Sequence, residues 1–183
     1  MKISGKIDAQ AKTYTNETFG IKFTLPEGFS FYDDAQMAEM NQSIRETATA
    51  ENIIQALESG NAFFDMVGSE ANGGSVTSVI AYASTPDIQA LDAAGYLKYA
   101  KESLEPQLSS VGAVLKDVQS GTYKNPETED TFAFLKVQFE ISGALMHEYL
   151  VCLKAGNYFM TVTLTAPDEA ELDKFFEHFA LVK

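Results

Sequence analysis

The chain has 183 residues, a mass of 20.0 kDa and 45% hydrophobic residues, values typical of one soluble globular unit that can bury a core. This composition excludes a disordered chain, a fibre and a peptide scaffold. The formal net charge is -13 and Arg45 is the only arginine, which argues against nucleic acid or an anionic lipid surface as a partner, because polyanions are bound mainly through Lys and Arg.

The N-terminal segment, residues 1–12, mixes small and charged residues without a period. We expect a flexible arm there, followed by a single domain over residues 13–183. Two short strands are predicted at residues 14–16 and 21–25, joined by a glycine turn. Residues 25–28, with the sequence Leu-Pro-Glu-Gly, predict a type I turn.

Two amphipathic helices are predicted next, one capped by Asp33 or Asp34 and one over residues 49–60. Their apolar positions recur every three or four residues: Met37, Met40, Ile44 and Ala48 in the first helix, and Ile53, Ile54 and Leu57 in the second. Extended runs at 62–67 and 75–83 follow them.

A long helix is predicted over residues 92–111, and we expect Pro106 to kink or divide it. A closing helix is predicted from Pro167 and Asp168 onward. Its buried side would carry Leu172, Phe175, Phe176 and Phe179.

Between these helices the pattern is that of strands, at 114–123, 132–141, 144–154 and 158–166. Apolar and polar residues alternate along 132–141, and tight glycine turns connect the last three strands into an antiparallel meander. The predicted fold class is therefore α+β, an antiparallel sheet flanked by helices, because each amphipathic helix needs an apolar sheet face to cover.

Three short strings near the N-terminus carry a resemblance to a known family. They are Tyr14-Thr15-Asn16, Phe19-Gly20-Ile21-Lys22-Phe23 and Pro26-Glu27-Gly28-Phe29. Together they resemble the opening of Mog1/PsbP-like domains, which implies an α/β/α sandwich. The continuation Phe31-Tyr32-Asp33-Asp34 looks like the version found in small bacterial lipoproteins of unknown function. The superfamily also includes photosystem extrinsic subunits and a partner of a nuclear transport GTPase, so the resemblance implies a fold more than a function.

The histidines and the cysteine do not form a ligand pattern. His147 and His178 are the only two histidines, with no spacing typical of zinc, and we expect both at a surface or an interface. Cys152 is the only cysteine, so no intramolecular disulfide can form, and its apolar surroundings predict a buried, inert thiol. No metal site, cofactor site or catalytic residue is predicted.

Acidic residues gather at two places. Asp33 and Asp34 are explained as helix caps, and Glu127, Glu129 and Asp130 as a solvated loop without the calcium-hand pattern. A carboxylate pair could in principle serve hydrolysis, although the aromatic residues that would line a cleft fall on core positions.

The leading hypothesis is a non-enzymatic binding or protein-interaction module, the mature domain of a bacterial envelope lipoprotein, with an unknown protein or small ligand as its partner. In that case the leader lies upstream of this sequence, because residues 1–7 lack the apolar run of a signal peptide, and the membrane is reached only through a lipid anchor absent from this sequence. Two alternatives stay open: a cytosolic acidic adaptor or chaperone for a basic partner, and an unrecognised hydrolase with a carboxylate pair.

Overall fold

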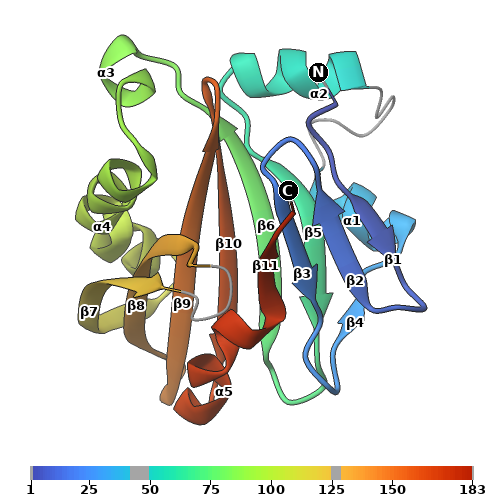
Figure 1. The fold of residues 1–183 in the computed structure, drawn as a ribbon. Coiled ribbons are helices and arrows are strands. Elements are labelled where there is room, and N and C mark those ends of the chain that lie inside the picture. The colour runs from blue at the N-terminus through green and yellow to red at the C-terminus, as the bar shows by residue number, and fades with distance from the viewer. Residues whose placement is uncertain (1, 42–49, 125–128, 183) are drawn as a thin grey trace.

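The computed structural model describes residues 2–41, 50–124 and 129–182. Within them, two antiparallel sheets pack face to face, with the smaller sheet in front of β5, β6 and β10 of the larger one (Figure 1). The large sheet has the order β4 (Ser30–Phe31), β5 (Phe63–Ser69), β6 (Ser75–Tyr82), β10 (Tyr158–Ala166), β9 (Ala144–Ala155), β8 (Thr131–Ile141) and β7 (Ala113–Lys124). The small sheet has the order β1 (Lys6–Asp8), β2 (Thr13–Asn16), β3 (Ile21–Thr24) and β11 (Phe179–Leu181).

The predicted meander is confirmed: β7, β8, β9 and β10 pair in sequence, each antiparallel to the next. At the turn between β8 and β9, Ser142 and Gly143 both have positive φ, 52° and 81°, as a tight hairpin turn requires. Strand pairing therefore follows the alternation that was visible in the sequence.

The two faces of the large sheet bury different layers. Helix α4 (Ala93–Ser110) covers one face at β7, β8 and β9, where Leu135, Val137 and Phe139 of β8 point toward it. The other face packs on the small sheet and on the C-terminal segment. The fold class is thus α+β, as predicted, and α4 runs through Pro106 as one helix without being divided.

The shorter helices each have a local cause. Helix α1 (Asp34–Met40) begins after Asp33, whose carboxylate accepts from the amide of Gln36 while the Gln36 side chain accepts from the amide of Asp33. It packs on β5, and α2 (Ala50–Glu58) packs on β6. A further single turn, α3 (Pro86–Gln89), was not predicted. The predicted apolar positions Ile44 and Ala48 lie outside the described residues.

The C-terminal segment differs from the prediction of one closing helix. Helix α5 (Glu169–Asp173) is followed by a 3-10 turn, η2 (Phe175–His178), and then by β11, which pairs with β3. Leu172, Phe175 and Phe179 are buried as expected. The chain leaves the helix because β11 satisfies the free backbone edge of β3 while Phe179 stays in the core.

The N-terminal segment also differs from a flexible arm over residues 1–12. Residues 6–8 form β1, which pairs with β2, and the Ile3 side chain is fully buried. Asn16 donates a hydrogen bond to the carbonyl of Ile3, and Thr18 donates one to the carbonyl of Lys2. These contacts come from residues 13–18, just beyond the segment, so the pattern within residues 1–12 alone could not reveal them.

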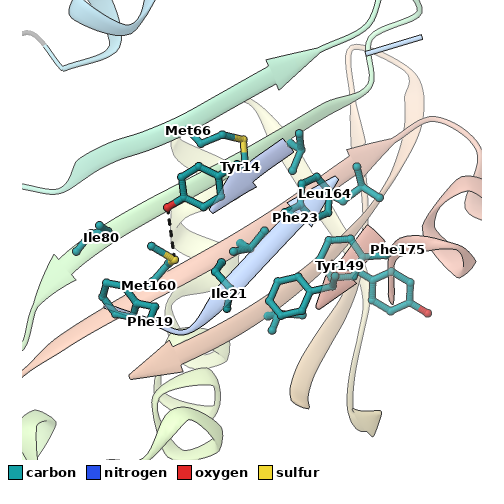
Figure 2. Packing of buried hydrophobic residues seen from close by; sticks show 14 of the residues in the cluster. Tyr14, Phe19, Ile21, Phe23, Met66, Ile80, Tyr149, Met160, Leu164 and Phe175 are labelled. Carbon is teal, nitrogen blue, oxygen red and sulfur yellow. Dashed lines mark hydrogen bonds between the residues drawn. The ribbon is translucent and has the colours of Figure 1, made fainter. Parts of the chain in front are cut away.

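A buried polar network joins the two sheets behind this arm. One carboxylate oxygen of Asp65 on β5 accepts hydrogen bonds from the Tyr14 hydroxyl at 2.5 Å, the Asn16 amide group at 2.9 Å and the backbone amide of Gly5 at 2.8 Å. Figure 2 shows Tyr14 from the small sheet lying between Met66 and Met160 of the large sheet. The Tyr-x-Asn string thus holds the small sheet and the arm against the large sheet.

Candidate functional site

A hollow opens where the turn after β3 faces the C-terminal segment. Its volume is about 270 Å³. Its lining combines apolar and charged side chains: Pro26, Glu27, Phe29, Leu164, Glu171, Lys174, Glu177 and His178. We call it the acidic hollow. Functional clefts are concave and mostly apolar with a few placed polar groups, and this hollow has that mixed lining.

The first wall is the Pro-Glu-Gly-Phe turn. Gly28 has φ 87°, which favours glycine, and the amide of Phe29 donates to the carbonyl of Pro26 at 3.3 Å. The Phe29 side chain then enters the core, and Lys12 donates to the Phe29 carbonyl at 3.3 Å. The turn is therefore anchored from both sides, and Glu27 at its tip stays exposed.

The second wall is formed by α5 and η2. Buried Leu172 and Phe175 anchor it, which leaves Glu171, Lys174 and Glu177 exposed on its outer side. An ion pair between Lys136 of β8 and Glu169 at 2.6 Å ties the start of α5 to the meander. The wall is held at both ends.

Negative charge is only partly balanced in the acidic hollow. In the described part of the chain, the ion pairs join lysines to carboxylates elsewhere, and none involves Glu27, Glu171 or Glu177. The pKa of Glu171 is raised, first by partial desolvation and then by the nearby charges of Glu70 and Asp168. Three carboxylates without an ion-pair partner among the described residues therefore share the lining with one lysine, Lys174, whose charge acts to lower the pKa of Glu171.

His178 completes the lining and is half-buried. Its ring lies 6.1 Å from the ring of Phe23. Desolvation lowers its pKa below the ordinary 6.5, against the opposing effect of Glu177. The imidazole is mostly neutral at pH 7 and leaves the negative excess in place.

A second acidic group lies on the opposite face of the large sheet. Glu148 of β9 is half-buried, and Thr165 donates a hydrogen bond to it at 3.2 Å. Desolvation raises the pKa of Glu148 to about 7. This carboxyl titrates near neutral pH, but it lies apart from the acidic hollow, because Glu148 and Leu164 are on opposite faces.

The buried network is closed to solvent and has a structural role. Desolvation raises the pKa of Asp65, although its hydrogen bonds from Tyr14, Gly5 and Asn16 act in the other direction. Tyr14 and Asn16 are fully buried. The side chains of Tyr14, Asn16 and Asp65 are too deeply buried to meet a ligand directly.

The residues singled out from the sequence are not brought together into one site. His147 is buried on β9, with Nδ1 3.4 Å from the Gln138 amide, where a position at a surface or an interface was expected. His178 lines the acidic hollow. The thiol of Cys152 is buried, as predicted, and desolvation raises its pKa.

The predicted acidic positions also separate. Asp33 caps α1, as predicted, and Asp34 is the first residue of that helix. Glu129 forms an ion pair with Lys124 at 3.0 Å, whereas Glu127 lies outside the described residues. In the described ranges, no group of three or more His, Cys, Asp or Glu side chains is arranged to hold a metal ion.

Sequence reasoning missed Glu27, Glu171, Lys174 and Glu177 as members of one site. They come from opposite ends of the chain, and no spacing in the sequence links them. Asp65 carried a usable signal, because a single acid inside the apolar run Phe63-Phe64-Asp65-Met66-Val67 needs buried partners.

Comparison with known proteins supports the fold. No family model and no curated protein sequence matches the chain. The solution structure of cyanobacterial PsbP (CyanoP) from Synechocystis sp. PCC 6803 matches with a TM-score of 0.52 and 12% identity, over 98% of this chain and 93% of that one. The predicted resemblance to the Mog1/PsbP-like fold is therefore confirmed at the level of the fold.

A second structure is more distant. A protein from Bacteroides thetaiotaomicron VPI-5482 matches with a TM-score of 0.42 and 11% identity. The match covers 100% of this chain and 50% of that one.

Within the described residues, no helix is both long enough and apolar enough to cross a membrane.

Proposed function

We propose that this chain is a non-enzymatic binding module that holds a partner at the acidic hollow, and that it acts in the bacterial cell envelope as the mature domain of a lipoprotein. The observation that carries the binding role is the hollow itself. Two separately anchored walls meet over an apolar floor and leave charged side chains without ion-pair partners among the described residues.

The state of the reactive side chains supports binding more than catalysis. A nucleophilic thiol needs a lowered pKa and access, and Cys152 has a raised pKa and is buried. Asp33 is engaged in capping α1, so the Asp33 and Asp34 pair has a structural explanation. Glu148, which titrates near pH 7, is hydrogen-bonded to Thr165 in the described structure.

The binding role can be tested by NMR with a fragment set that contains cationic, neutral and anionic small molecules. We expect saturable binders to shift the backbone amides of residues 26–29 and 171–178. The matched control is the double variant Glu102→Gln, Glu105→Gln on the exposed side of α4, which changes the net charge without touching the hollow. Binders that map elsewhere, or a set without any binder, would contradict the proposal.

The envelope role rests on the resemblance of the N-terminal strings to small bacterial lipoproteins. It predicts that the native protein is recovered with the envelope fraction of its host and carries a lipid-modified cysteine upstream of residue 1. Recovery in the cytosolic fraction would contradict this part and would favour the cytosolic acidic adaptor, which the net charge of -13 also fits.

A further inference from the structure

The charged rim and the apolar floor of the acidic hollow each select a different property of the occupant. The floor is formed by Phe29 and Leu164, both almost completely buried, and by the half-exposed ring of Pro26. Any occupant that reaches this floor must bring apolar atoms with it. The rim carries the carboxylates, so an occupant that fits both must be apolar along its length and positive at one end.

The carboxylates leave room for an incoming cation. The ion pairs among the described residues, such as Lys116–Glu140 at 2.9 Å and Lys136–Glu169 at 2.6 Å, lie away from the hollow. The hollow has one cation of its own, Lys174, which faces three glutamates. The carboxylates of Glu27, Glu171 and Glu177 have no such pair within the described residues. Partial desolvation is the largest cause of the raised pKa of Glu171, and the charges of Glu70 and Asp168 add to it against the opposing effect of Lys174.

The size of the hollow limits the occupant. At about 270 Å³ it is smaller than the roughly 300–1,000 Å³ of pockets that enclose drug-sized ligands. A single side chain or a very small molecule fits this volume better than a cofactor. The hollow also lies at the surface between two exposed walls, where a partner protein can reach it.

We infer that the acidic hollow takes a lysine side chain presented by a protein partner, with its methylene stem on Pro26, Phe29 and Leu164 and its ammonium group among the carboxylates. This inference rests on the proposed binding function and names its ligand. A lysine places an apolar stem and a charged end in this arrangement when it lies along apolar surface.

Lysine fits better than arginine for a geometric reason. The ammonium group is a compact charge with three donors that point in different directions, whereas guanidinium presents all of its donors in one plane. Glu27 lies on the first wall, and Glu171 and Glu177 lie on the second. Carboxylates on facing walls suit the compact charge.

The test measures Kd by NMR for lysine blocked as its N-acetyl methylamide, with matched probes of norleucine, arginine and glutamate and with free butylammonium. For a ligand of this size, blocked lysine should bind with a Kd on the order of 1 mM. We expect it to bind about fivefold or more tightly than blocked norleucine, and this advantage should disappear when NaCl rises from 0.05 to 0.5 M.

Variants locate the effect. Each of the variants Glu27→Gln, Glu171→Gln and Glu177→Gln should raise the Kd of blocked lysine about two- to fivefold, as expected for exposed charge pairs. The Kd of blocked norleucine should stay unchanged. The control variant Glu102→Gln, Glu105→Gln should change the Kd of neither probe. Thermal unfolding of each variant establishes that the fold is retained.

The outcomes separate the two proposals. If norleucine binds at the hollow as tightly as lysine, the cation assignment is overturned and the binding function stands. Tighter binding of arginine or of free butylammonium overturns the assignment to a lysine side chain in the same way. If no probe shifts residues 26–29 and 171–178, the binding function fails as well.

Discussion

The carboxyl of Glu148 should make the stability of this protein depend on pH in a way that a single substitution removes. Its pKa rises from 4.5 to about 7 in the folded state because partial burial on β9 desolvates it, although the hydrogen bond from Thr165 acts in the other direction. One pKa unit corresponds to about 1.4 kcal/mol. The charged form is thus disfavoured in the folded state by about 3 kcal/mol, and partial exposure makes this an upper value.

The sign follows from proton binding. Between the unfolded pKa of 4.5 and the folded pKa of about 7, the folded state binds the proton more tightly, so folding stability falls as pH rises through this window. Glu148→Gln keeps the shape and an oxygen that accepts from Thr165, but it cannot ionise. Relative to wild type, it should therefore gain about 2 to 3 kcal/mol of stability between pH 5 and pH 8.

Urea unfolding at pH 5 and pH 8 measures this gain, because all other titrating groups are common to both proteins. Glu102→Gln, on the exposed side of α4, serves as the control and should show a difference near zero. A gain from Glu148→Gln that is the same at both pH values would refute the reasoning, because burial would then not disfavour the charged form.

Three further predictions concern other groups. Tyr14→Phe should cost about 1.5 to 3 kcal/mol in urea unfolding, since it removes a donor from the buried Asp65 carboxylate, and an equal cost for the exposed control Tyr99→Phe would contradict a role for the network. The Kd of blocked lysine should rise from pH 7 to pH 5, because His178 gains a proton below pH 6.5 and because Glu171, whose pKa is raised, binds protons more readily than an ordinary glutamate; a flat pH profile in NMR titrations would argue against this. Cys152 should react with a colorimetric disulfide reagent only after unfolding, so rapid labelling of the native protein would disprove its burial.

The meander was predictable because its information is local. Alternating residues along β8 define both faces of the strand, and tight turns define the neighbours of β9. The starts of α1 and α4 were predictable for the same reason, since a cap such as Asp33 acts within one turn, whereas the single turn α3 was missed. Local periodicity carries over into the fold wherever the partner is the next element in the chain.

The C-terminal segment and the acidic hollow could not be predicted, because they depend on contacts between segments that are distant in the chain. The spacing of Leu172, Phe175, Phe176 and Phe179 fits a helix, yet the free edge of β3 draws Phe179 into a strand. The acidic hollow has the same origin, because its two walls meet only in the folded chain. The resemblance to Mog1/PsbP-like domains was carried by residues 14–29, which include the first wall of the acidic hollow. It contained no information about the second wall, formed by α5 and η2.

The pairing of β11 with β3 also has a consequence for the order of folding. The pairing joins Phe23 to Phe179, and it closes a loop that contains most of the chain. Contacts with such large sequence separation form slowly, and during synthesis the N-terminal segments emerge first. The first wall of the acidic hollow, residues 26–29, is therefore synthesised well before the second wall, α5 and η2, which it needs to form the hollow. A nascent chain, or one that stops short of η2, can hold a formed meander and still lack the second wall of the acidic hollow, so the hollow is complete only in the finished chain.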